Sequence, residues 1–351
     1  MSKLPPIEEI EEQLRTQLSE LLGDSARVRR FKSDDSRERA KFQVQVGNEG
    51  ALTGIVRSRG DAATVASVIE QIDRNEILDN EASLLVVPYM GEVGAELCRE
   101  AGIHWADLSG NAHITFGKVY VHVRGNPNDF KSRGRPSNVF APKSSRISRF
   151  LLQHPNSSFS QRELAYFTNL SDGYTSKIVH RLEDKNLIVR HNDGSVSVRN
   201  PDLMLDAWRE RYDFDKHRVI RGTVSARNTG ELLDKLTEGL DALGGTYAAT
   251  GLAAAWLMTK FASHRITTFY VEQSPPETWK RELRLHEEPR GANTWLVVPT
   301  DRGVFQGQEP VGGVSCVHPI QVYLDLEGHP ERSDEAADSI RRKCMPWSEN
   351  D

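Results

Sequence analysis

Apolar residues recur at helical spacing in three consecutive segments near the middle of the chain. They predict helices over 144–153, from 160 to about 169 and from 174 to about 185. Two strand-like segments follow at 187–190 and 195–199, with a four-residue turn between them, and they predict a β-hairpin. Three helices followed by a hairpin is the element order of a winged helix-turn-helix, in which the hairpin is the wing.

The second and third of these helices carry further signals. Ser160 and Glu163 have the S-x-x-E spacing of a capping box at a helix start. The third helix has an apolar face and a polar face, and we expect its polar face to enter a DNA major groove while the wing approaches the adjacent backbone or minor groove. The candidate DNA-contacting residues are Ser171, Tyr174, Thr175, Ser176, Lys177, His180 and Arg181 in and before the helix, and Arg190, His191 and Asn192 in the wing.

Residues 1–124 have the pattern of a small α/β unit. An opening helix between Pro6 and Gly23 has an apolar stripe, which is either core-facing or dimer-forming. The remaining expected elements are strands at 42–46, 52–57 and 84–87, helices at 62–74 and 93–101, and a hairpin of 112–116 with 119–123.

Proline, glycine and basic residues mark residues 125–142 as an extended linker. Its Arg133 and Arg135 are candidates for minor-groove contact. We therefore expect an α/β (α+β) chain with domains at 1–124, 143–200 and 201–351, the last boundary falling near residue 200 or after a helix from 203 to about 212.

Charge supports the placement of a DNA-binding segment. The whole chain of 351 residues has a net charge of −5, yet residues 131–199 hold twelve Lys or Arg and only five Asp or Glu. A local basic surface is what phosphate binding requires of an acidic chain. On the first helix we expect Lys143, Arg146 and Arg149 to fix the register through phosphates.

Composition excludes several other classes. The longest apolar stretch, 247–258, is well short of the ~20 residues of a membrane span. The first residues lack the pattern of a signal peptide, so a cytoplasmic protein is expected. Cys98, Cys316 and Cys344 are widely spaced, which argues against a disulfide framework and a zinc site. No cofactor and no metal are expected.

Residues 102–112 hold the pattern Asp107-x-x-Gly110-Asn111. It resembles a segment of degenerate restriction-endonuclease-like domains that precede winged helices in bacterial regulators. A working nuclease of that fold needs a further acidic residue on the next strand, and none occurs between Asn111 and Asn128. We expect Asp107 and Asn111 to cap a turn or bond the backbone instead.

The C-terminal part carries a second resemblance. Residues 247–256, the strand at 267–271, the sequence VHPIQVYLDL at 317–326 and Glu335-Ala336-Ala337 look like the C-terminal domain of the AbiEi family, the antitoxins of type IV toxin-antitoxin systems. The resemblance implies a bacterial DNA-binding repressor of its own operon that is paired with a nucleotidyltransferase toxin, and it implies no catalytic activity.

The family's C-terminal domain is similar in layout to a nucleotidyltransferase core. Here the glycine turn would be Thr250-Gly251, and the strand at 267–271 is followed by one carboxylate, Glu272, where a pair is needed to hold two metal ions. We expect a fold without that activity, although Asp301 and Asp325 are possible additional carboxylates. The run 319–326 is either a strand or a helix, and the Tyr323 hydroxyl should bond a buried polar neighbour.

Two functions from different classes follow. The first is a sequence-specific regulator that binds double-stranded DNA, as a dimer or with a second DNA-contacting domain, and has a toxin or another protein as a possible partner. The second is a nucleic-acid enzyme, a metal-dependent nuclease or a nucleotidyltransferase, in which the winged helix only holds substrate.

Overall fold

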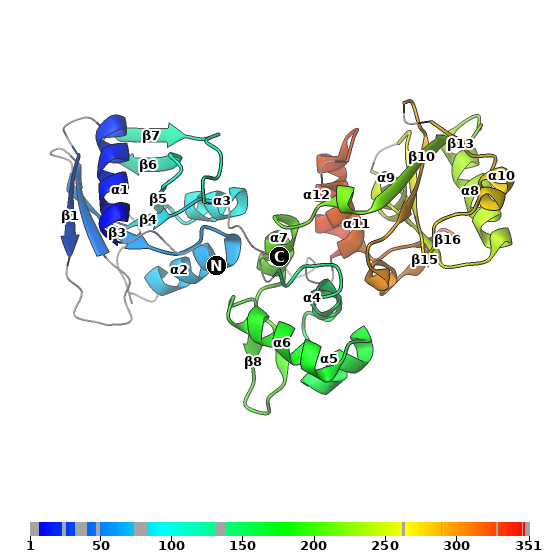
Figure 1. Ribbon diagram of the computed structural model, residues 1–351, viewed down its shortest axis with the longest axis horizontal. Coiled ribbons are helices and arrows are strands. Elements are labelled where there is room, and N and C mark those ends of the chain that lie inside the picture. The colour runs from blue at the N-terminus through cyan, green and yellow to red at the C-terminus, as the bar shows by residue number, and fades with distance from the viewer. Residues whose placement is uncertain are drawn as a thin grey trace. The chain divides into compact units, whose positions relative to one another are not determined.

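The computed structural model describes residues 7–22, 26–31, 41–46, 50–73, 83–130, 138–261, 264–288, 290–327, 329–345 and 347. Helices and sheets are mixed along the chain, which confirms the expected α/β class (Figure 1). The chain divides into two compact units, Met1–Ser137 with Lys185–Leu187, and Asn138–Asp184 with Ile188–Asp351. No described helix is long and apolar enough to cross a membrane.

A seven-stranded sheet forms the centre of the first unit, and its strands follow one another in chain order from β1 to β7. The pairs β3–β4 and β4–β5 are parallel and the other four pairs are antiparallel. The strands are β1 (Ala26–Phe31), β2 (Lys41–Val46), β3 (Gly50–Val56), β4 (Ser83–Val87), β5 (His104–Asp107), β6 (Ala112–Phe116) and β7 (Val119–Val123).

Helices cover both faces of this sheet. The stripe of α1 (Ile7–Leu22) is core-facing, because Leu14 and Leu18 are fully buried in one cluster with Leu84 and Val86 of β4. The alternate β4 residues Leu85 and Val87 pack on the other side with α2 (Ala62–Asp73) and α3 (Glu92–Glu100). Since β4 is buried on both faces, it reads as a continuous apolar run.

Two strands of the first unit are absent from the sequence prediction. β1 has the sequence ARVRRF and β5 has HWAD, and neither shows the apolar run of a buried strand. β5 is nevertheless buried along its whole length, because Ala106 packs in the cluster with α1 on one face of the sheet and Trp105 packs with α2 and α3 on the other. β5 is a strand because it pairs with β4 and β6, and such pairing cannot be read from the residues of β5 alone.

The second unit begins with the three predicted helices and the predicted hairpin, which we call the three-helix segment. Its elements are α4 (Ser145–Gln153), α5 (Gln161–Thr168), α6 (Asp172–Glu183), β8 (Ile188–Arg190) and β9 (Val196–Val198). The capping box is confirmed, since the Ser160 hydroxyl accepts from the Glu163 amide while the Glu163 carboxylate accepts from the Ser160 amide. α6 begins two residues earlier than expected, with Ser171 as its N-cap.

The rest of the second unit is a seven-stranded sheet in the order β13-β10-β14-β12-β11-β16-β15. Helices α9 (Gly251–Thr259), α11 (Pro319–Leu326) and α12 (Ser333–Cys344) contact one another on one side of it, and α8 (Thr229–Leu243) packs against β12 on the other (Figure 1). The strands are β10 (Arg218–Thr223), β11 (Tyr247–Thr250), β12 (Thr267–Val271), β13 (His286–Glu287), β14 (Thr294–Val298), β15 (Glu309–Val311) and β16 (Val314–Cys316).

The helices of this part include the segment whose type the sequence left open. Residues 319–326 form a helix, α11, and every residue from Ile320 to Leu326 is buried. Because the helix is buried on all sides, its apolar residues show no clear period from which a helix could be told from a strand. The helices are α7 (Pro201–Arg209), η3 (Phe214–Lys216), α8 (Thr229–Leu243), α9 (Gly251–Thr259), α10 (Glu277–Glu282), η4 (Arg302–Phe305), α11 (Pro319–Leu326) and α12 (Ser333–Cys344).

Candidate nucleic-acid interface

The outer face of α6 is polar and open to solvent. Ser176, Lys177 and His180 are exposed, and Arg181 is half-buried. Within the part of the chain that the structure describes, neither Lys177 nor Arg181 has a carboxylate partner, whereas His180 lies 3.7 Å from Asp184. The opposite face carries buried Ile178, Val179 and Leu182 and fixes the helix to its segment.

The N-terminal end of α6 lies beside the start of α4. The Tyr174 hydroxyl is 2.8 Å from the Ser144 hydroxyl, and the Lys143 ammonium lies 5.5 Å from the centre of the Tyr174 ring. Lys143 and Ser171 are both exposed. One cation from outside α6 thus joins the surface that α6 presents.

In the β8–β9 hairpin, Arg190 is already paired. Its guanidinium donates to both carboxylate oxygens of Glu183, at 2.9 and 2.8 Å, and to the Gly194 carbonyl at 3.3 Å. His191 lies within hydrogen-bonding distance of the Ser197 hydroxyl, at 2.9 Å, and Asn192 is exposed. The hairpin therefore offers less unpaired positive charge than its sequence suggests.

Thr175 does not belong to this surface. Its side chain is 0% exposed and lies three and four positions before Ile178 and Val179, on the buried face of α6. The expectation that Thr175 contacts DNA is wrong, because α6 turns this residue toward the core.

Arg149 is also buried, at 2% exposure, so the expected phosphate contact is wrong. Its guanidinium donates to the side-chain oxygen of Gln321 on α11 and lies 4.9 Å from the centre of the Trp208 ring. Burial lowers the pKa of Arg149.

Arg146 is also bonded to residues of the second unit and is largely buried. Its guanidinium donates to both carboxylate oxygens of Asp301, at 2.7 and 2.8 Å, and to the Thr168 carbonyl at 3.3 Å. With its side chain only 12% exposed, Arg146 does not present its charge to phosphates as the sequence suggested. Arg133 and Arg135, the linker candidates, lie outside the described residues.

Asp107 has the structural role that the sequence predicted. Its carboxylate accepts from the amides of Met90, Ser109 and Asn111 and from the Asn111 side chain, at 2.9 to 3.1 Å. Burial raises its pKa, although these bonds oppose the shift. The side chain ties the end of β5 to the turn that follows, which confirms its expected role.

The carboxylates considered for nucleotidyl transfer are held apart in separate contacts. Glu272 pairs with Arg302 at 3.5 Å, and Asp301 pairs with Arg146. Asp325 is buried and accepts from Thr250, Tyr212, Tyr270 and Gln321. Among the described residues, no group of three or more His, Cys, Asp or Glu could hold a metal ion.

Tyr323 is buried and its hydroxyl has polar partners, but these partners are partly exposed arginines and not the buried neighbour that the sequence predicted. Its hydroxyl accepts from Arg209 at 3.3 Å and from Arg341 at 3.2 Å. Arg341 also pairs with Asp202 and Asp206 of α7. The hydroxyl therefore helps to join α11 to α7 and α12.

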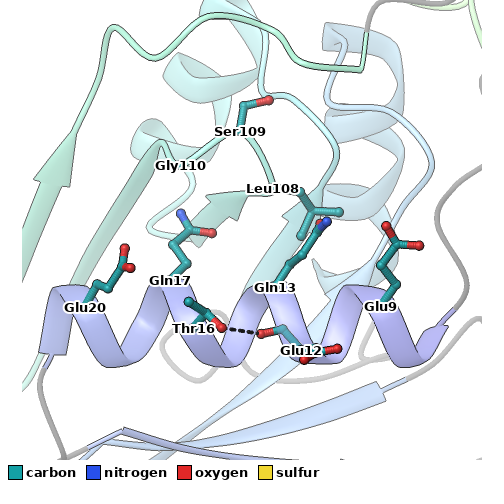
Figure 2. A pocket seen from close by; sticks show the side chains of 9 residues that line it. All are labelled: Glu9, Glu12, Gln13, Thr16, Gln17, Glu20, Leu108, Ser109 and Gly110. Atoms are coloured by element: carbon teal, nitrogen blue, oxygen red, sulfur yellow. Dashed lines mark hydrogen bonds between the residues drawn. The ribbon is translucent and has the colours of Figure 1, made fainter.

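A pocket of about 460 Å³ lies in the first unit, and the sequence did not point to it. Figure 2 shows Gln13 and Gln17 of α1 directed toward the loop at residues 108–110. Glu9, Glu12 and Glu20 make its lining acidic. These residues lie on the polar side of an amphipathic helix, where sequence alone does not distinguish a pocket wall from an ordinary solvated face.

Comparison with known families agrees with the resemblance found in the sequence. Residues 175–346 match the AbiEi_2 family model, described as a transcriptional regulator, AbiEi antitoxin of a type IV toxin-antitoxin system. The match begins within α6 and includes the β8–β9 hairpin and nearly all of the C-terminal part, so the resemblance is confirmed there. No curated protein and no solved structure gives a match.

Proposed function

We propose that this protein is a transcriptional regulator that binds double-stranded DNA in sequence-specific fashion, represses its own operon and serves as the antitoxin of a toxin-antitoxin pair. The three-helix segment acts as a winged helix-turn-helix, and α6 is its recognition helix. The observation that carries the proposal is the outer face of α6, where Ser176, Lys177 and Arg181 are accessible and the two cations lack carboxylate partners among the described residues.

In this proposal α6 lies in the major groove. Lys177 and Arg181 are four positions apart and so share one face of the helix. Both suit guanine N7 and O6, while the Ser176 hydroxyl can bond any base edge. Tyr174 and Lys143 contact a phosphate at the start of the helix, and Asn192 approaches the neighbouring backbone from the wing.

The test compares binding to the duplex upstream of the gene with binding to a scrambled duplex of equal length, by fluorescence anisotropy over a range of salt concentrations. We expect a preference of about 10³-fold or more for the upstream duplex near physiological salt. Equal affinity for both duplexes would contradict the proposal.

Single substitutions connect that preference to α6. Arg181→Ala should cost about 1–3 kcal/mol on the upstream duplex and relax specificity at its base pair. Lys216→Ala is the control, because Lys216 is an exposed cation in η3, outside the three-helix segment, where it pairs with Asp213. Unchanged binding by Arg181→Ala would remove this residue from the interface.

The partner proposals have separate tests. Operators are commonly palindromic, so we propose that two copies bind one operator, which light scattering of the DNA complex would reveal as a mass of two chains per duplex. For the antitoxin role, co-expression with the product of the adjacent gene should relieve its toxicity. Relief by the Arg181→Ala variant would separate neutralisation from DNA binding.

A further inference from the structure

One face of α4 is directed toward the C-terminal part of the second unit. Arg146, Arg149 and Gln153 occupy positions i, i+3 and i+7 of the helix, which lie on one side. Arg146 bonds Asp301 and Arg149 bonds Gln321, while the Gln153 side chain donates to the Gln306 carbonyl at 2.8 Å. α4 is therefore held to the C-terminal part along its whole length.

Arg146 also contacts the turn that leads into α6. While two of its nitrogens bond Asp301, its third reaches the carbonyls of Thr168 and Asn169, at 3.3 and 3.5 Å. Asn169 has a left-handed backbone, with φ of 53°, and is where the chain leaves α5. One side chain thus joins α4, the turn before α6 and Asp301.

The contact leaves little room beside Gly303 of η4. A Cβ atom on Gly303 would lie 2.7 Å from an Asp301 carboxylate oxygen and 2.8 Å from Cγ of Arg146. A larger residue there would push Asp301 and Arg146 apart. A side chain at position 303 could therefore be accommodated only by a shift of this ion pair.

We propose that Arg146 and Asp301 are positioning residues for DNA recognition. Their ion pair fixes the turn after α5, and with it the start of α6, on the frame of the C-terminal part. Arg146 acts through the carbonyls of that turn and makes no phosphate contact, because its side chain is largely buried and three of its nitrogens are bonded. This inference rests on the proposed role of α6 as the recognition helix.

Sequence-specific and non-specific DNA binding depend differently on the position of α6, which this ion pair fixes. Base-edge hydrogen bonds require side chains placed to within about 0.5 Å, whereas attraction to phosphates tolerates displacement. Loss of the ion pair should therefore lower the affinity for the upstream duplex and leave the affinity for a scrambled duplex unchanged.

The experiment uses the full chain with Asp301→Asn, Arg146→Gln and the double variant. Each single variant should bind the upstream duplex about 3- to 30-fold more weakly, and the double variant no more weakly than either single one. The dependence of affinity on salt should stay at the wild-type slope. The matched control is Asp206→Asn, which weakens a similar two-oxygen pair, with Arg341, between α7 and α12.

Three results would overturn the proposal. A salt slope reduced by about one in Arg146→Gln would make Arg146 a phosphate contact. An equal loss in Asp206→Asn would indicate a general loss of stability. Wild-type affinity of both single variants for the upstream duplex would show that the ion pair positions nothing.

A measurement without DNA separates this proposal from the proposed function. In Asp301→Asn, amide hydrogen exchange over residues 169–175 should be at least tenfold faster than in the wild type, while exchange in β12 stays the same. If the wild type shows no preference for the upstream duplex, the proposed function fails. The hydrogen-exchange measurement then tests by itself whether the Arg146–Asp301 ion pair fixes the start of α6. Unchanged exchange over 169–175 in Asp301→Asn would overturn the positioning role of the ion pair, whatever the result of the DNA-binding measurements.

Discussion

Arg149 of α4 donates a hydrogen bond to the side chain of Gln321 on α11, and both residues are buried, at 2% and 0% exposure. Gln321 in turn donates to the carboxylate of Asp325 at 2.6 Å. A cation that the sequence assigns to DNA phosphates thus lies in the interior of the second unit. The count of basic residues in the three-helix segment therefore overstates the charge available to DNA.

Removal of Arg149 should affect stability more than electrostatics at the DNA surface. Arg149→Ala leaves Gln321 and Asp325 without their buried cation and opens space over Trp208, so we expect a loss of about 3–5 kcal/mol in the free energy of unfolding. Arg149→Met keeps the packing over Trp208 and should cost less. Urea denaturation gives both values, and a loss below about 0.5 kcal/mol for Arg149→Ala would place this side chain at the surface.

Asp325 should make stability depend on pH. Burial raises the pKa of its carboxyl to about 6, against the opposing effect of hydrogen bonds from Thr250, Tyr212, Tyr270 and Gln321. In the unfolded chain the pKa is about 3.9. Between these values the unfolded chain binds fewer protons at this group than the folded protein, so its contribution to stability falls as pH rises from about 4 to about 6.

The Asp325→Asn variant lacks this titration. Relative to the variant, the wild type should lose about 3 kcal/mol of unfolding free energy across that pH range. Urea denaturation of both proteins at several pH values provides the comparison. A difference that stays constant with pH would show that Asp325 titrates normally.

Thr175 and Ser176 form a matched pair of adjacent hydroxyls on α6. The Thr175 hydroxyl is buried and lacks a hydrogen-bond partner among the described residues, whereas Ser176 is exposed. Thr175→Val removes an unpaired buried polar group, so DNA affinity should stay within twofold and stability should not fall. Ser176→Ala should weaken binding to the upstream duplex by about 1 kcal/mol. The reverse order of effects in anisotropy titrations would mean that α6 docks through its other side.

Asp107→Ala tests whether the first unit uses this carboxylate for structure or for chemistry. Four donors lose their shared acceptor, and we expect the unit to lose about 3 kcal/mol or more of stability. Hydrogen exchange in β5 measures the change, and Asp129→Ala, at an exposed position, is the control. Loss of a magnesium-dependent cleavage activity with unchanged stability would favour the enzyme instead.

The sequence by itself determined the features that depend only on residues close together along the chain. The capping box at Ser160 needs only two side chains three positions apart, and both of its bonds are present. Helical periodicity located α4, α5 and α6, and the alternating segments around residues 191–194 located the hairpin. The family resemblance likewise rests on short motifs, and the family match covers them.

Tertiary structure decided which of the predicted residues face solvent. Arg146 and Asp301 are 155 positions apart, and Arg149 and Gln321 are 172 apart, so no local pattern shows that these pairs meet. A long basic side chain on an amphipathic helix serves equally well against a phosphate or a distant carboxylate. Burial is set by what the rest of the chain packs against a residue, which is why the interior places of Thr175 and Arg149 had to come from the fold.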